Sequence, residues 1–133
     1  MKIGELSSRT GCPVGTIRFY ESKGLLGPAR RGPGNQRIYG TADLERLRYI
    51  MDCRANGMKL ECIERFIEFQ KDPSLGTPWL LERVDDYLDL LEKNMASLRK
   101  LRQHLTGVRA SLVESIRAAE ERKAGEEPAD SGT

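Results

Sequence analysis

The chain has 133 residues, of which 32% are charged and 38% are hydrophobic, and its formal net charge at pH 7 is +2. It contains no apolar run of about 18 residues and no signal-peptide core at its start, so a membrane helix is excluded and a cytoplasmic protein is expected. Three cysteines without a CxxC pair and a single histidine argue against a disulfide scaffold, a closed zinc site, a bound cofactor and an enzyme.

The charge is divided unevenly along the chain. Residues 1–60 carry 11 basic and 5 acidic residues, a net charge of +6, whereas residues 61–133 carry 11 basic and 15 acidic residues, a net charge of −4. A basic front half and an acidic back half favour a polyanion-binding head joined to a separate association module.

The first elements form a helix-turn-helix pattern. Ile3 and Leu6 begin an amphipathic helix that ends at Gly11, and a second helix is predicted from residue 14 to about 22. Gly24 supplies the left-handed cap that ends this second helix. Two short helices joined by a short turn are typical of a DNA-binding head.

Residues 30–40 are too rich in glycine and proline for a helix. They predict a small hairpin with a Gly-Pro-Gly-Asn tip and an arginine-rich flank. Thr41 is the expected N-cap of the next helix, which runs to about residue 55 and ends at Asn56-Gly57. A further helix begins at about residue 60 and is broken by Asp72-Pro73.

A long helix is predicted from Thr77-Pro78, an N-cap followed by proline at the first helical position. Its apolar residues recur at steps of three and four, as in a heptad repeat, and such a seam needs a partner helix. The expected organisation is a DNA-binding domain (1–71), a linker (72–77), a coiled-coil dimerisation helix (78–121) and a disordered tail (122–133).

The predicted second helix carries the chemistry of a nucleic-acid contact. Thr16 and Tyr20 lie one turn apart, and Arg18 lies between them. Their hydroxyl and guanidinium groups can donate to phosphate oxygens, and arginine can also read guanine in the major groove. In the hairpin, Arg30, Arg31, Arg37 and Tyr39 add further donors beside a glycine-rich tip.

Several spaced motifs resemble the head of the MerR family of transcription regulators. They are Ile3-Gly4-Glu5-Leu6, Thr10-Gly11, Thr16-Ile17-Arg18-Phe19-Tyr20-Glu21, Gly24-Leu25-Leu26, Arg37-Ile38-Tyr39, Asp43-Leu44-Glu45-Arg46-Leu47 and Gly57-Met58. The resemblance implies a mainly α fold: a winged helix-turn-helix head with a β-hairpin wing, followed by a long helix that forms an antiparallel coiled coil.

The same resemblance implies a function. It predicts a homodimer that binds a near-palindromic promoter operator, distorts the DNA when an effector binds, and so changes the access of RNA polymerase. The residues expected to contact double-stranded DNA are Thr16, Arg18, Phe19, Tyr20, Arg30, Arg37, Tyr39 and Lys59. A DNA-binding architectural protein that does not switch a promoter is the alternative from another class, and a free-standing coiled-coil protein is a more distant one.

The sequence does not identify the effector to which the expected regulator responds. Gly11-Cys12-Pro13-Val14 and Asp52-Cys53-Arg54 resemble the heavy-metal-sensing branch of the family. That branch implies a thiolate at the start of the dimerisation helix and a cysteine pair just beyond its end. Here the first position falls near Thr77 and no cysteine follows Cys62, so no metal site is expected.

Two other effector hypotheses remain. Cys53 resembles the single sensor cysteine of a smaller branch that responds to aldehydes or nitrosative stress, and Arg54 and Lys59 could lower its pKa. The alternative is that Cys53 is simply a small buried residue. Trp79 and Tyr87 share one face of the long helix and could line a pocket for an organic ligand, although packing of Trp79 against the head explains the same residue.

Overall fold

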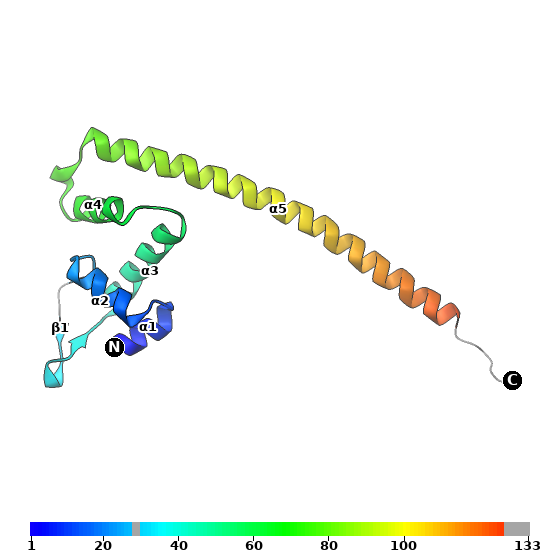
Figure 1. Cartoon of the computed structure of the whole chain (residues 1–133), viewed down its shortest axis with the longest axis horizontal. Helices are drawn as coiled ribbons and strands as arrows, with labels where there is room; N and C mark the ends of the chain where they lie inside the picture. The colour runs from blue at the N-terminus through cyan, green and yellow to red at the C-terminus, as the bar shows by residue number, and fades with distance from the viewer. Residues whose placement is uncertain (28–29, 127–133) are drawn as a thin grey trace. The chain divides into compact units, whose positions relative to one another are not determined.

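A computed structural model describes residues 1–27 and 30–126, and its chain divides into two compact units at Tyr87 and Leu88. The elements in chain order are α1 (Ile3–Thr10), α2 (Val14–Ser22), β1 (Arg30–Arg31), a 3₁₀ turn (Pro33–Asn35), β2 (Arg37–Ile38), α3 (Thr41–Ala55), α4 (Leu60–Lys71), a second 3₁₀ turn (Pro73–Leu75) and α5 (Pro78–Gly125) (Figure 1). The predicted mainly α fold with a hairpin and a long final helix is confirmed.

The turn of the helix-turn-helix is held by two side chains of α1. The Ser7 hydroxyl donates to the carbonyl oxygen of Cys12 at 2.6 Å, and the Cys12 amide donates to Thr10 Oγ1 at 3.2 Å. After α2, Gly24 adopts φ +73°, a left-handed conformation that glycine reaches without steric cost. The sequence therefore predicted the end of α2 from a local signal.

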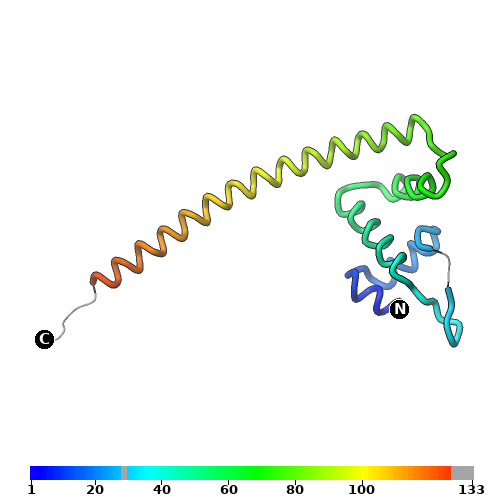
Figure 2. The backbone as a smooth tube through the Cα atoms, turned by 180° about the vertical axis from the view of Figure 1, so that it is seen from behind, coloured from blue at the N-terminus to red at the C-terminus, as the bar shows by residue number. Residues whose placement is uncertain are grey.

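The hairpin after α2 is short and antiparallel. Arg30 pairs with Ile38 and Arg31 pairs with Arg37. At the tip, the Arg31 guanidinium donates to the carbonyl oxygen of Asn35 at 2.9 Å, which braces the turn. Figures 1 and 2 show this hairpin projecting away from the helices of its unit. The predicted wing is therefore present.

Asp43 joins the wing to the start of α3. Its carboxylate accepts from the amide of Gly40 at 2.9 Å and from the amide of Gly27 at 3.2 Å. Because this carboxylate caps Gly40, the N-cap is Gly40 and the helix already includes Thr41. The predicted N-cap at Thr41 was thus one residue late.

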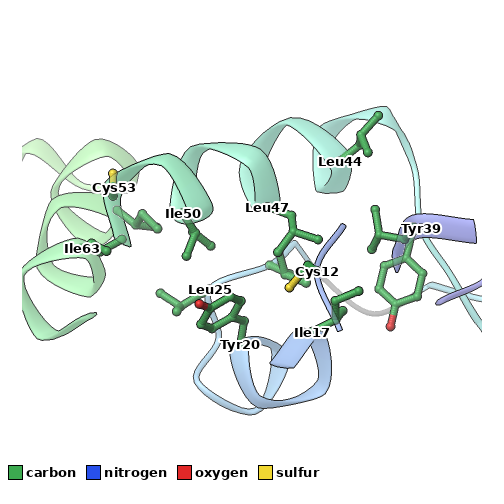
Figure 3. Packing of buried hydrophobic residues seen from close by; sticks show 13 residues of the cluster. Cys12, Ile17, Tyr20, Leu25, Tyr39, Leu44, Leu47, Ile50, Cys53 and Ile63 are labelled. Atoms are coloured by element: carbon green, nitrogen blue, oxygen red, sulfur yellow. The ribbon is translucent and has the colours of Figure 1, made fainter. Parts of the chain in front are cut away.

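The core of the first unit lies between α3 and the helices that surround it. Figure 3 shows Leu47 and Ile50 of α3 pointing toward Ile17 and Tyr20 of α2. The fully buried large side chains are Leu6, Ile17, Leu47, Ile50, Ile63 and Ile67, which come from α1, α2, α3 and α4. Each such side chain contributes about 1.5–3 kcal/mol on burial, so α2 is fixed by its inner face and leaves its outer face free.

The first turns of α5 belong to the same compact unit as the head. The Thr77 hydroxyl oxygen accepts from the Leu80 amide at 3.2 Å, and Leu80 is buried in a small cluster with Cys62 and Phe66 of α4. The compact unit thus extends to Tyr87, beyond the predicted boundary at residue 71. This packing required tertiary contacts that the sequence periodicity did not reveal.

At its other end α5 continues through Gly125, so the predicted helix end at residue 121 is four residues short. Arg122, Lys123 and Ala124 are good helix formers, and the glycine after them ends the helix. The rest of the predicted tail, residues 127–133, lies outside the described residues. Across the described part of the chain, no helix is both long and apolar enough to cross a membrane.

Candidate nucleic-acid interface

Two side chains on the outer face of α2, and the side chain of Lys23 just after the helix, face solvent. Arg18 is exposed, and Phe19 is 47% exposed, although it is a large apolar residue. The Lys23 ammonium lies 5.7 Å from the centre of the Phe19 ring, in a cation–π arrangement. Lys23 was missing from the predicted contact set, although its basic character was visible in the sequence. Thr16 is half-buried on the same helix.

Tyr20 lies largely on the inner side of α2. Only 8% of the residue is exposed, and its ring belongs to the main core cluster, 6.0 Å from the ring of Phe19. The sequence assigned Tyr20 to a DNA contact, whereas the structure gives its ring a packing role. The spacing of four residues from Thr16 did not tell whether Tyr20 lies on the inner or the outer side of the helix.

Glu21 connects α2 to the wing. Its Oε2 lies 3.1 Å from Nε of Arg37, and its Oε1 accepts a hydrogen bond from the Tyr39 hydroxyl. The side chain of Glu21 is only 10% exposed, so this carboxylate is held inside the junction. Two residues of the wing are thereby fixed to the helix that precedes it. Glu21 is the last residue of the sequence motif that begins at Thr16, but the sequence alone assigned it no role.

The side chain of Tyr39 is buried, and its hydroxyl has a partner within the protein. It is 3% exposed, its hydroxyl is engaged by Glu21, and the Arg37 guanidinium lies 5.7 Å from the centre of its ring. Its backbone pairs with the chain start: the Tyr39 amide donates to the Met1 carbonyl oxygen, and the Met1 amino group donates to the Tyr39 carbonyl oxygen, both at 2.7 Å. These contacts favour a supporting role for Tyr39 in the wing, and the direct contact of its hydroxyl with DNA stays a prediction.

A cleft of about 880 Å³ opens between the start of α1, the outer side of α2 and strand β2. Its lining includes Lys2, Arg18, Gln36 and Arg37, together with the Glu21 carboxylate. Arg30 lies exposed on the neighbouring strand β1. Two arginines expected from the sequence are thus brought to one concave surface, with Lys2 as a base that sequence reasoning missed. Such a cluster of basic donors suits the phosphates of a polyanion.

The surroundings of Glu21 also shift the pKa of its carboxyl group. Burial raises the pKa of Glu21 above the ordinary glutamate value, the Arg37 guanidinium opposes this, and the Asp43 carboxylate adds to the increase. Burial is the largest of these effects, so the folded protein holds the proton on Glu21 more tightly than the unfolded chain does.

This shift predicts a pH-dependent stability difference. Between the ordinary and the raised pKa the folded state binds more protons, so the contribution of Glu21 to the free energy of unfolding falls as pH rises. We therefore expect the free energy of unfolding of wild type, minus that of Glu21→Gln, to fall as pH rises from about 4 to about 7. Thermal unfolding at a series of pH values measures this difference. Glu45→Gln, an exposed glutamate on α3, is the control. A difference that rises with pH would contradict the burial argument.

A second basic loop joins α3 to α4 at residues 56–59. Lys59 is exposed and occupies the N-cap position of α4, without a capping hydrogen bond from its side chain. The Arg54 guanidinium donates to the Met58 carbonyl oxygen at 3.1 Å, and the Lys59 amide donates to the Tyr87 hydroxyl oxygen at 3.1 Å. The predicted contact residue Lys59 therefore lies on a braced loop.

Cys53 does not have the environment expected of a reactive thiol. It is 6% exposed within the core, and burial raises its pKa, although a hydrogen bond with Tyr49 acts in the opposite direction. The expected lowering by Arg54 and Lys59 is absent from the effects that act on this thiol, and the Arg54 side chain is engaged by Met58. The environment of Cys53 matches the alternative of a small buried residue.

Comparison with known proteins decides the family. The description "MerR HTH family regulatory protein" fits residues 1–70, and "MerR, DNA binding" fits residues 44–108. The chain belongs to the MerR family. It is 32% identical over 113 residues to the HTH-type transcriptional regulator ZntR homolog of Haemophilus influenzae, a match that covers 85% of this chain and 84% of that relative. It is accordingly a transcription regulator with a DNA-binding domain.

Solved structures of MerR proteins resemble the chain as well. One is the transcription regulator PbrR691 from Ralstonia metallidurans CH34 in complex with lead(II), with 39% identity, a TM-score of 0.56, and coverage of 84% of this chain and 86% of that one. Another is HiNmlR, a MerR family regulator lacking the sensor domain, bound to promoter DNA. Its identity is 22%, its TM-score 0.60 and its coverage 96% of both chains, which establishes the shared fold.

Proposed function

We propose that this MerR protein binds promoter DNA as a homodimer and changes the access of RNA polymerase by distorting the DNA. The observation that carries the proposal is the junction at Glu21, which fixes the arginine-bearing wing to the helix that exposes Arg18. The contact set on each copy is Arg18, Phe19, Lys23, Arg30, Arg37 and Lys59, with half-buried Thr16 at its edge. Tyr20 and Tyr39 support this surface from the core.

The exposed apolar residues of α5 support the homodimer. Leu88, Met95, Leu98 and Leu105 are between 47% and 64% exposed, and they continue the heptad positions predicted from the sequence. A stripe of this kind on a helix of 48 residues is stabilised when a second helix covers it. We infer that a second copy of the chain provides that helix.

Charge along α5 favours an antiparallel pair. Residues 82–92 carry five acidic side chains and one base, whereas residues 93–109 carry five bases and no acid. An antiparallel pair that sets Leu88 against Leu98 of the second copy also sets Leu81 against Leu105, because both helices keep the heptad. Residues 82–92 then face residues 94–104, so acids meet bases. A parallel pair would set acids against acids.

The free energy needed to distort DNA supports the proposed switching step. Bending or untwisting a site costs a few kcal/mol, which is the scale on which an effector couples to a protein conformation.

The relatives named as metal-dependent and the lead(II) complex of PbrR691 raise the question of a metal effector. Here the donor set does not fit a soft metal: Cys12, Cys53 and Cys62 are all buried, and α5 contains no cysteine. Within the described residues no cluster of three or more His, Cys, Asp or Glu could hold a metal ion.

Transcription in vitro tests the proposal. With RNA polymerase and the promoter of the gene that encodes the chain, we expect added protein to protect the promoter and to change the transcript yield. Protection without any change in yield under all conditions would favour the architectural alternative. The absence of protection would overturn DNA binding itself.

The same assay tests the thiol hypothesis. Because Cys53 is buried and its pKa is raised, we expect Cys53→Ala to respond to formaldehyde as wild type does, with a slightly lower unfolding temperature from the lost packing. Induction by formaldehyde that vanishes in Cys53→Ala would restore the sensor role of this cysteine.

A further inference from the structure

Tyr87 of α5 reaches the loop between α3 and α4. Its hydroxyl oxygen accepts from the Lys59 amide at 3.1 Å. Its ring meets the ring of Phe66 edge-on, with centroids 6.2 Å apart and planes at 89°, and it packs against the buried cluster of Cys62, Phe66 and Leu80. Apolar packing therefore fixes the ring, and the hydroxyl is directed at one backbone amide.

The loop is braced from the opposite side by α3. The Met58 amide donates to the Cys53 carbonyl oxygen at 3.0 Å, and the Arg54 guanidinium donates to the Met58 carbonyl oxygen at 3.1 Å. Gly57 has φ +86°, which lets the chain turn sharply before Lys59. The brace from α3 ends at Met58, and the next amide is held by Tyr87.

We propose that Tyr87 is a positioning residue for DNA binding, which sets the backbone of Lys59 and so directs its ammonium group at a phosphate. This inference rests on the proposed function. The amide of Lys59 precedes α4 and takes no part in the helix ladder, so the Tyr87 hydroxyl is its partner within the described residues. Tyr87 belongs to α5, which also carries the proposed dimer seam. One hydrogen bond thus connects the dimerisation helix to a DNA contact.

A double-mutant cycle tests this link. The probe is a duplex of about 30 base pairs, selected for tight binding from a random library and long enough for two half-sites. Lys59→Ala is expected to lower the slope of log affinity against log salt by about two for the dimer, since one phosphate contact is lost from each copy. Tyr87→Phe keeps the ring and is expected to weaken binding about fivefold to fiftyfold and to lower the slope in the same direction.

The cycle separates positioning from general stability. If Tyr87 acts through Lys59, Tyr87→Phe has no further effect in the Lys59→Ala background. In the protein without DNA, the Lys59 amide exchanges faster with solvent in Tyr87→Phe, as followed by NMR. Ser111→Ala, which removes an exposed hydroxyl on α5 far along the helix from Tyr87, is the control and leaves the Lys59 amide unchanged.

Three results would overturn the inference in distinguishable ways. If Tyr87→Phe binds like wild type while Lys59→Ala is impaired, the positioning role fails and DNA binding stands. If Tyr87→Phe weakens binding equally with and without Lys59, Tyr87 has only a structural role. If wild type fails to bind any duplex, the proposed function fails, and the positioning role falls with it.

Discussion

Replacing Arg18 with alanine is expected to weaken the binding of duplex DNA about 30-fold to about 10⁴-fold. Arg18 is exposed on the outer face of α2 and lines the cleft shared with the wing. A good contact from arginine to a base edge contributes about 1–3 kcal/mol, and a dimer makes this contact twice, which gives about 2–6 kcal/mol. Fluorescence anisotropy with a labelled duplex at fixed salt measures the change.

Arg65→Ala is the matched control, because it removes the same charge from α4 at a residue that stacks 5.2 Å from the Trp79 ring. We expect its affinity to stay near that of wild type. If Arg18 reads a base, its loss relaxes the preference among sequences; if it binds phosphate, its loss weakens all sequences alike and lowers the salt slope by about two for the dimer. Equal affinities for the Arg18 and Arg65 variants would remove α2 from the interface.

Local signals in the sequence were sufficient for most of the secondary structure. The ends of α1 and α2 follow from Gly11 and Gly24, and the start of α5 follows from Thr77 before a proline. Each of these signals acts on its own helix terminus and needs no distant partner. The exposure of Arg18 was predictable in the same way, because it follows from helical periodicity once Ile17 faces the core.

Contacts between distant residues were not predictable in this way. Glu21 meets Arg37 and Tyr39 only because the wing folds back onto α2, and no periodicity links those positions. The hydrogen bond between Lys59 and Tyr87 spans 28 residues and depends on how α5 begins to pack on α4. Tyr20 and Tyr39, which the sequence assigned to DNA contacts, are examples. A phenol can donate to a phosphate or pack at the edge of a core, and only the tertiary packing determines which of these its surroundings allow.

Charge reversal along α5 is expected to weaken the dimer about fourfold to a thousandfold. The double change Asp85→Lys and Asp89→Lys places bases opposite the partner's Arg99 and Arg102 in the antiparallel register. Two pairs at each end of the dimer give four pairs, and each exposed pair contributes about 0.2–1 kcal/mol. Sedimentation equilibrium at low salt measures the dissociation constant, and the effect shrinks at high salt because the pairs are screened.

The compensating change distinguishes the two orientations of the helices. In an antiparallel dimer, adding Arg99→Glu and Arg102→Glu to the first pair of substitutions restores opposite charges across the seam and returns the affinity toward wild type. In a parallel dimer Asp85 and Asp89 face their own copies, so the first pair of substitutions only exchanges acid–acid repulsion for base–base repulsion, and the affinity barely changes.

Leu98→Asp is the control for the seam, because it buries a carboxylate in either orientation and should give a monomer. DNA affinity should follow the dimer in each variant, since two half-sites bound together gain by avidity what one copy cannot supply alone. A monomer that bound the duplex as tightly as wild type would separate the function of the head from that of α5.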